Sequence, residues 1–264
     1  MSKKNTLHPA PFLIAEVSAN HNGSLKHAKE LIKTAKKFGA NAVKLQTYTA
    51  DTMTIKSNRD EFKIMKGIWK GQTLWDLYNK AQTPFEWHKE LFSYAKKLKI
   101  NCFSTPFDET AVDMLEQVNC PLYKIASFEM TDHILLKKVA KTKKPIIIST
   151  GTLSSKEIKK LIFFLKKIKC KKFVILHCVT EYPANYKNIK LKTIEHIKDK
   201  YKCLTGYSDH TSGIGVAISS INYGACVIEK HFTIDKRLDG PDHRLSILPK
   251  ELKLLHEFRL EKTK

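Results

Sequence analysis

The sequence predicts a single α/β domain with the architecture of a (β/α)8 TIM barrel. Eight short apolar runs rich in β-branched residues alternate with amphipathic segments of helical period, within a chain of 264 residues. Eight such repeats in about 250 residues are typical of this barrel. A doubly wound sheet would more often open on a glycine-rich turn, and the first loop, Ser18–Ser24, contains no GxGxxG pattern. We therefore expect one domain over residues 1–264.

The predicted strands are continuous apolar runs, as expected for parallel strands that are buried on both faces. They cover Phe12–Val17, Ala42–Thr47, Asn101–Pro106, Leu122–Ser127, Pro145–Thr150, Lys172–Cys178, Leu204–His210 and Cys226–Phe232.

The predicted helices lie between these strands and carry start and stop signals. Ser24 is the expected N-cap of a helix over Leu25–Phe38, and Gly39 follows as its stop. The next long helix opens at Thr83–Glu86, with proline at its first position and a glutamate placed as in a capping box. A longer insertion, Ala50–Gly71, is expected to form a lid or rim. The remaining helices are expected near Glu109–Gln117, Asp132–Lys141, Ser155–Lys169, Thr193–Lys200, Gly213–Tyr223 and Lys250–Glu261.

Composition favours a cytoplasmic protein without a membrane partner. No apolar run approaches the roughly 18 residues that a membrane-spanning helix needs. The start of the chain also lacks the apolar stretch of a signal peptide. The six cysteines show no CxxC spacing, so we expect reduced thiols, mostly in the core.

The net charge of +21 raises the question of a nucleic-acid partner. The basic residues are almost all lysines that recur along the predicted helices, and the chain has only four arginines. This pattern indicates solvated helix faces, because no basic stripe interleaved with aromatic residues is present. We expect no nucleic-acid partner, whereas the positive field favours a small anionic substrate.

The carboxyl ends of barrel strands meet at one face, where the active sites of such barrels lie. In this chain, every predicted strand ends in polar residues. They are Glu16, Lys44, Gln46, Ser104, Thr105, Lys124, Ser127, Glu129, Ser149, Thr150, His177, Thr180, Ser208, Asp209, His210, Glu229, Lys230 and His231.

Two histidines, His210 and His231, end neighbouring predicted strands 21 residues apart. We expect their imidazoles to meet beside the carboxylates of Asp209, Glu229 and Asp242. Imidazole and carboxylate ligands suit Mn²⁺, Zn²⁺ or Fe²⁺, and two protein nitrogens leave positions open for a substrate. The pattern predicts a catalytic metal site, and the alternative is two unrelated polar strand ends.

Two lysines, Lys44 and Lys124, fall within buried strands, where a charge is costly unless it is paired or binds an anion. Lys44 shares a strand face with Gln46. Together with nearby Ser and Thr hydroxyls, the lysines indicate a phosphate or carboxylate pocket. Two alternatives stay open: each lysine could extend past a helix into solvent, or one could form a Schiff base as in aldolases.

Eight short segments form a specific pattern through their order and spacing. They are Ile14–Ser24, Val43–Gln46, Ser104–Phe107, Tyr123–Glu129, Ile147–Gly151, Ser208–Thr211, Ile228–Phe232 and Gly240–Asp242. With them, the chain resembles the sialic acid synthase family of phosphoenolpyruvate-condensing enzymes over roughly residues 10–260. Within that family, Lys44–Thr49, Gly67–Trp69 and Thr83–His88 look more like pseudaminic acid synthases than N-acetylneuraminate synthases.

The resemblance implies condensation of phosphoenolpyruvate with 2,4-diacetamido-2,4,6-trideoxy-altrose to give pseudaminic acid and phosphate. It further implies that His210 and His231 hold a divalent metal, typically Mn²⁺, and that Glu16 is the acid/base near C2. Lys124 would be catalytic as well as anion-binding. The other implied substrate contacts are Lys44, Gln46, Thr105, Phe107, Ser127 and Ser149 toward phosphoenolpyruvate, and Glu129, Tyr182, Ser208 and Asp242 in the sugar and metal region.

Alternatives within and outside this class stay open. A synthase of N-acetylneuraminate or legionaminate is one, and a catalytically silent barrel that serves as a binding subunit is another. The family usually carries a C-terminal antifreeze-like domain that reaches into the partner subunit's active site. This sequence stops at Lys264, where the last barrel helix should end, so we expect no such domain here and hold a homodimer open.

Overall fold

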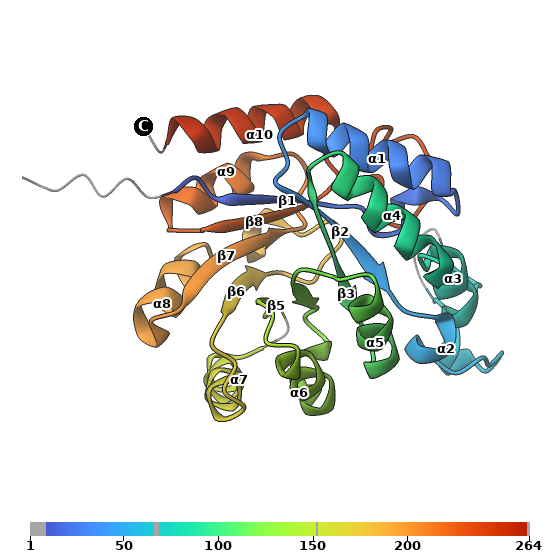
Figure 1. Cartoon of the computed structure of the whole chain (residues 1–264), viewed down its shortest axis with the longest axis horizontal. Helices are drawn as coiled ribbons and strands as arrows, with labels where there is room; N and C mark the ends of the chain where they lie inside the picture. The colour runs from blue at the N-terminus through green and yellow to red at the C-terminus, as the bar shows by residue number, and fades with distance from the viewer. Residues whose placement is uncertain (1–8, 66–68, 152, 263–264) are drawn as a thin grey trace, which may run out of the picture.

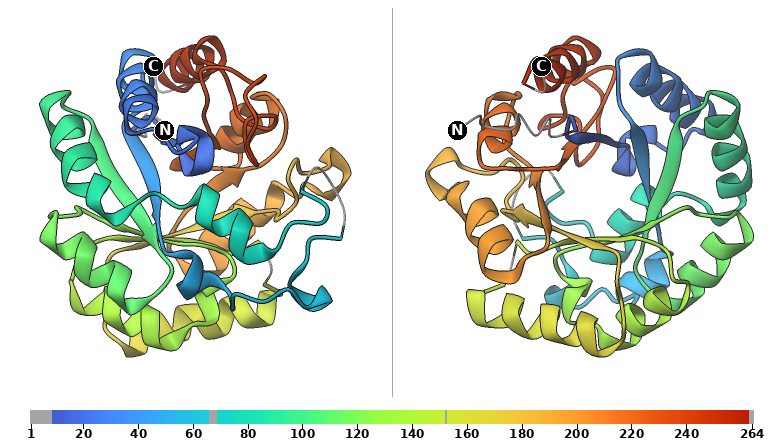
Figure 2. Two further views of the ribbon diagram at one scale, coloured as in Figure 1. Left: turned by 90° about the vertical axis from the view of Figure 1, so that its right-hand side faces the viewer. Right: turned by 60° about the vertical axis from the view of Figure 1, so that its left-hand side comes forward.

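The computed structural model describes residues 9–65, 69–151 and 153–262. Eight parallel strands pair in sequence order from β1 to β8 and close into a barrel, and helices surround it as an outer ring (Figure 1 and Figure 2). The predicted (β/α)8 TIM barrel is confirmed. The expectation about a signal peptide concerns mainly residues 1–8, which lie outside the described residues.

The observed strands match the predicted ones closely, and β4 differs most because the chain leaves the sheet after Ile125. The strands are β1 Phe12–Glu16, β2 Ala42–Thr47, β3 Asn101–Pro106, β4 Tyr123–Ile125, β5 Ile146–Ser149, β6 Phe173–Cys178, β7 Leu204–Asp209 and β8 Val227–His231.

The helices follow the predicted order, with two additions, α2 and α3, that the sequence analysis did not predict. They are α1 Leu25–Lys37, α2 Ala50–Met53, α3 Leu74–Ala81, α4 Phe85–Lys97, α5 Glu109–Gln117, α6 His133–Lys141, α7 Ser155–Lys167, α8 Lys192–Tyr201, α9 Gly215–Asn222 and α10 Pro249–Glu261.

Capping by a side chain explains where α1 begins but not where α4 begins. The side chain of Ser24 accepts a hydrogen bond from the backbone N–H of His27, as predicted for the N-cap of α1. The predicted capping box at α4 is wrong, because Pro84 occupies the N-cap and makes no side-chain cap bond. Thr83 instead places its hydroxyl 3.3 Å from Nε2 of His21.

The core that holds the barrel lies mainly between strands and helices. Leu13 and Ala15 of β1 are fully buried in one cluster with Leu31 and Ile32 of α1. Because side chains alternate along a strand, Glu16 then points to the barrel interior. The same alternation decides on every strand which polar residue reaches the active-site face.

The six cysteines are free, four of them buried and two half-buried. None of the described helices is long and apolar enough to cross a bilayer.

Candidate active site

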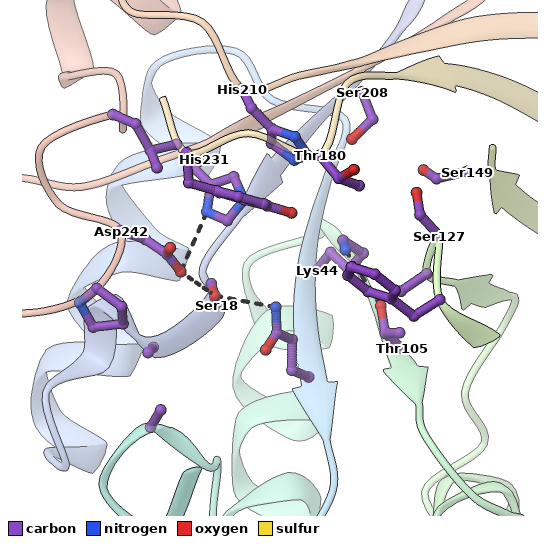
Figure 3. Close-up of a pocket in the computed structure, with 18 of the residues that line it drawn as sticks. Ser18, Lys44, Thr105, Ser127, Ser149, Thr180, Ser208, His210, His231 and Asp242 are labelled. Carbon is purple, nitrogen blue, oxygen red and sulfur yellow. Dashed lines mark hydrogen bonds and ion pairs between the residues drawn. The ribbon is translucent and has the colours of Figure 1, made fainter. Parts of the chain in front are cut away.

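A pocket of about 650 Å³ opens at the carboxyl ends of the strands. Figure 3 shows Thr105, Ser127 and Ser149 on one side of it and His231 and Asp242 on the other. Most of the predicted site residues line it. These are Lys44, Gln46, Thr105, Phe107, Lys124, Ser127, Ser149, Tyr182, Ser208, His210, His231 and Asp242.

The floor of the pocket is a chain of four buried charged groups. Nζ of Lys44 lies 2.9 Å from Oε2 of Glu16 and 3.5 Å from Oε2 of Glu229. Nζ of Lys124 lies 3.3 Å from Oε1 of the same Glu229. Both lysines face the barrel interior, with exposed fractions of 5% and 2%. Glu229 thus joins β8 to β2 and β4 across the barrel floor.

The two carboxyl groups in the pocket floor, Glu16 and Glu229, have opposite tendencies to ionise. Burial raises the pKa of Glu16 to about 7, because the charge of Lys44 offsets the desolvation only in part and Glu229 adds repulsion. Burial alone would also raise the pKa of Glu229, but Lys124 and Lys44 hold it at about 2. The hydroxyl of Ser208 donates a hydrogen bond of 2.9 Å to Glu229. Glu229 is therefore a permanent counter-ion, whereas Glu16 can gain or lose a proton near neutral pH.

The opposite side of the pocket holds the predicted imidazole pair. The ring centroids of His210 and His231 are 5.4 Å apart, and the ring of Tyr182 lies 4.2 Å from that of His210. Burial lowers the pKa of His210 to about 4, with a further contribution from His231, and lowers that of His231 to about 3, with a further contribution from the charge of Lys44. Both rings are therefore neutral at neutral pH, which is the state in which histidine binds a metal.

A hydrogen bond orients the ring of His210, whereas the ring of His231 has a neighbouring carboxylate without a hydrogen bond. Nδ1 of His210 lies 2.8 Å from the carbonyl oxygen of Val179, which assigns the proton to Nδ1 and leaves a lone pair on Nε2. Nδ1 of His231 is buried and has no hydrogen-bond partner among the described residues, and it lies 3.5 Å from Oδ2 of Asp242. Each ring thus keeps a nitrogen that a ligand can use.

Asp209 does not join this site, so its predicted place beside the imidazoles is wrong. It alternates with Ser208 along β7 and points to the opposite face of the strand. There it accepts hydrogen bonds from the backbone N–H of Thr211 and, at 3.0 Å, from Nζ of Lys230. Asp209 and Lys230 are fully buried. His177 likewise faces outward, with its ring 5.7 Å from that of Tyr207.

We expect the Lys230–Asp209 pair to contribute to stability and not to catalysis. Lys230→Met should lower the free energy of unfolding by about 3–5 kcal/mol, because it leaves a buried carboxylate unpaired. Lys236→Met is the matched control, since its partner Glu251, at 3.1 Å, is partly exposed, and it should cost about 0–1 kcal/mol. Urea unfolding measures both. Equal midpoints for the two variants would contradict the structural role.

Glu129 lies beside the pocket but does not line it. It begins the short 3-10 helix Glu129–Thr131 after β4. Burial raises its pKa, and the charge of Lys124 partly offsets the shift. The contact of Glu129 with a sugar therefore stays a prediction. Glu16, which pairs with Lys44 in the floor, is likewise not among the lining residues.

Several pocket residues were missed by the sequence analysis. Ser18 directly follows the predicted strand Phe12–Val17, and this position could have revealed it. It accepts a hydrogen bond from Gln46 at 3.1 Å and donates one of 2.5 Å to Asp242. Glu229 was noted only as a nearby carboxylate, although it pairs with both floor lysines. The other missed lining residues include Tyr48, Trp69, Tyr78 and Arg244.

The insertion after β2 reaches the pocket, as the lid or rim prediction requires. Trp69 lines the pocket, and so do Leu77 and Tyr78 of the unpredicted helix α3. The ring of Tyr48 packs edge-to-face with those of Tyr78 and Phe107. The ring centroids are 6.0 Å apart for Tyr78 and 5.2 Å apart for Phe107, and the three rings form an aromatic wall. Gly67 and Ile68, which contributed to the resemblance, lie outside the described residues.

Buried lysines lie opposite paired imidazoles at the mouth of a (β/α)8 barrel, and this arrangement is that of an enzyme of the TIM-barrel class. The chain belongs to the NeuB family, whose profile matches residues 31–262. It is 42% identical to the pseudaminic acid synthase of Campylobacter jejuni over 236 residues, which are 89% of this chain and 69% of that protein. It is also 42% identical to the N,N'-diacetyllegionaminic acid synthase of the same species over 246 residues, covering 92% and 73%.

A solved structure agrees with this assignment. The N-acetylneuraminic acid synthetase of Leptospira borgpetersenii, crystallised in complex with citrate, matches with a TM-score of 0.87 and 32% identity. The match covers 100% of this chain and 88% of that one. The predicted resemblance to the sialic acid synthase family is confirmed.

Proposed function

We propose that this chain condenses phosphoenolpyruvate with 2,4-diacetamido-2,4,6-trideoxy-altrose, which yields pseudaminic acid and inorganic phosphate. The observation that carries this function is the division of one pocket into two halves. Lys44 and Lys124 provide cations near the hydroxyls of β3 to β5, and the imidazole pair faces them. The similarity to pseudaminic acid synthases supports the choice of product.

The cationic half suits the phosphate and carboxylate of phosphoenolpyruvate. Thr105 lies on the same side as Lys44, with Oγ1 3.3 Å from Nζ. Oγ of Ser149 is buried and has no hydrogen-bond partner among the described residues, so it is free to contact an anion. Charge-assisted hydrogen bonds from such groups bind phosphate strongly.

Glu16 is the group best suited to move a proton in this reaction. C3 of phosphoenolpyruvate bonds to the aldehyde carbon of the open-chain sugar, whose oxygen takes up a proton to become a hydroxyl. Water adds to C2, the C2–O bond to phosphate breaks, and the C2 hydroxyl loses its proton as the ketone forms. The Glu16 carboxylate accepts a proton from that water, and its pKa of about 7 suits this task at neutral pH. Lys44 holds the carboxylate in place through their 2.9 Å contact.

The imidazole pair fits a divalent metal, which we propose to be Mn²⁺. Both rings are neutral and each keeps a free nitrogen, whereas no group of three or more His, Cys, Asp or Glu suited to a metal occurs among the described residues. His210 and His231 would therefore hold the ion with positions left open for water and substrate. A bound metal would supply Lewis-acid polarisation of the sugar's aldehyde oxygen.

The aromatic wall favours a 6-deoxy sugar over N-acetylmannosamine. The rings of Tyr48, Tyr78 and Phe107 offer an apolar surface to a C6 methyl group. A C6 hydroxyl buried there without a partner would be disfavoured. A legionaminic acid synthase stays the second candidate, because the chain is equally similar to one.

The test is incubation of the purified chain with phosphoenolpyruvate, Mn²⁺ and a panel of N-acetylated sugars. We expect phosphate release only when an acceptor sugar is present, and product mass identifies the acid formed. In direct competition the trideoxy altrose should be used ahead of N-acetylmannosamine. Phosphate release without any sugar would contradict the proposal, and a preference for N-acetylmannosamine would make the enzyme an N-acetylneuraminate synthase.

The cellular location and the oligomeric state that we propose follow from the family resemblance. We place it in the cytoplasm, where phosphoenolpyruvate is available, and propose a homodimer. Light scattering on the purified chain tests the assembly.

Lys124 should bind the anion and not form an imine. Lys124→Met is expected to raise the KM for phosphoenolpyruvate by about tenfold or more and to leave the KM for the sugar nearly unchanged. Lys138→Met on α6 is the matched control, because its partner Asp113 is exposed. Burial lowers the pKa of Lys124, a property shared with Schiff-base lysines, so borohydride trapping is the decisive measurement. A trapped adduct on Lys124 would overturn this role.

A further inference from the structure

Arg244 is an exposed residue in the loop between β8 and α10, and it lines the active-site pocket. No hydrogen bond or ion pair of its guanidinium to any described residue is present, in contrast to the other three arginines. Arg59 pairs with Glu61, Arg237 pairs with Asp235, and Arg259 donates to the carbonyl oxygen of Pro11. Arg244 is thus an arginine with its donors available.

The loop beneath Arg244 is held firmly on both sides. Asp242 accepts the hydrogen bond from Ser18. His243 is fully buried, with Nδ1 2.8 Å from Oγ1 of Thr233 and Nε2 2.9 Å from Oδ1 of Asn22. The backbone of Arg244 is therefore positioned by its neighbours, while the donors of its side chain remain available to a ligand.

The place of the loop in the barrel indicates which substrate it meets. β8 pairs with β1 and β7, so in the closed barrel it lies opposite β4. Lys124 and Ser127 belong to β4 and the turn after it, on the cationic side, whereas Arg244 is two residues beyond Asp242, on the imidazole side. In the proposed reaction the anion occupies the first side and the sugar the second.

We propose that Arg244 is a specificity-determining residue that donates hydrogen bonds to the carbonyl oxygen of an acetamido group on the acceptor sugar. This inference rests on the proposed function and adds to it a contact from the barrel's own loop. A guanidinium offers several N–H donors in a rigid plane, which suits a carbonyl oxygen at the mouth of a pocket. The other cations of the pocket, Lys44 and Lys124, pair with Glu16 and Glu229 on the side proposed for the anion.

The test compares Arg244→Ala with Arg237→Ala. Both variants remove one arginine from the same loop, but Arg237 is paired with Asp235 and lies outside the pocket lining. Arg244→Ala should raise the KM for the sugar by about tenfold to a hundredfold and leave the KM for phosphoenolpyruvate within about twofold. Arg237→Ala should match the unchanged enzyme in both constants.

Sugar analogues then identify the group that is read. Analogues carry a hydroxyl in place of one acetamido group at a time, and calorimetric titration in the absence of phosphoenolpyruvate measures their binding. For the unchanged enzyme, one analogue should bind more weakly than the full sugar. For Arg244→Ala, that analogue and the full sugar should bind with equal affinity, because the two losses concern the same contact and are not additive. Additive losses for both analogues would overturn the contact.

The remaining outcomes separate this inference from the proposed function. An unchanged enzyme that releases no phosphate with any sugar would sink the function. An active enzyme in which Arg244→Ala behaves like Arg237→Ala, or in which only the KM for phosphoenolpyruvate rises, would overturn the inference alone.

Discussion

Glu16→Gln is expected to lower kcat by about 10²- to 10⁴-fold, the range that general acid–base catalysis typically contributes. Glutamine keeps the size of the side chain but cannot take the proton from the water that adds to C2. The remaining ion pairs of the pocket floor should be kept in this variant, because Lys44 retains Glu229 as a partner. Steady-state phosphate release measures the loss. Glu129→Gln is the matched control, since Glu129 is also a carboxyl with a raised pKa, whereas Glu16 is the one that pairs at 2.9 Å with Lys44 in the pocket floor.

The pH dependence of the same variant checks the assignment independently. The pKa of Glu16 is raised from 4.5 to about 7, so kcat/KM should rise as the pH passes through about 7 and the base forms. Glu16→Gln should lose this limb of the profile. A raised pKa also means that the folded state holds its proton more tightly than the unfolded chain does. That contribution to stability is present below about pH 4.5 and is lost as the pH rises through about 7. An unchanged pH profile in Glu16→Gln would contradict its role as the base.

His210→Ala and His231→Ala should each lower kcat by at least about two orders of magnitude, because the metal they would hold polarises the aldehyde. Each variant should also lose most of its affinity for Mn²⁺ in calorimetric titration, a measurement that does not depend on activity. His196→Ala, on the exposed face of α8, is the control and should bind Mn²⁺ as the unchanged chain does.

Chelation tests the same assignment without a mutation. EDTA should abolish phosphate release, and added Mn²⁺ should restore it. Full activity in the chelator, or unchanged Mn²⁺ affinity in both histidine variants, would remove the metal from the proposal.

Much of the site was predictable because a parallel barrel converts strand order into position. Once Lys44 and His231 are assigned to strand ends, the fold brings them to one face whatever the loops do. The pocket residues that the sequence analysis did not predict lie in the segments that connect the strands. Tyr78 comes from α3 and Arg244 from a long connection, and neither segment has a strand to fix its direction.

The order of strands and helices, the barrel, and the polar groups at the strand ends could be predicted from the residues alone, because they follow from local periodicity and composition. Which of those polar groups share a pocket depends on how the strands pack in three dimensions. Asp209 and Glu229 look alike in sequence, yet one lies on the outer face with Lys230 and the other joins Lys44 and Lys124 on the floor. The physical reason is that a shift of one residue along a strand turns a side chain to the opposite face. The protonation of Glu16 likewise depends on burial beside Lys44 and Glu229, residues that come from other strands.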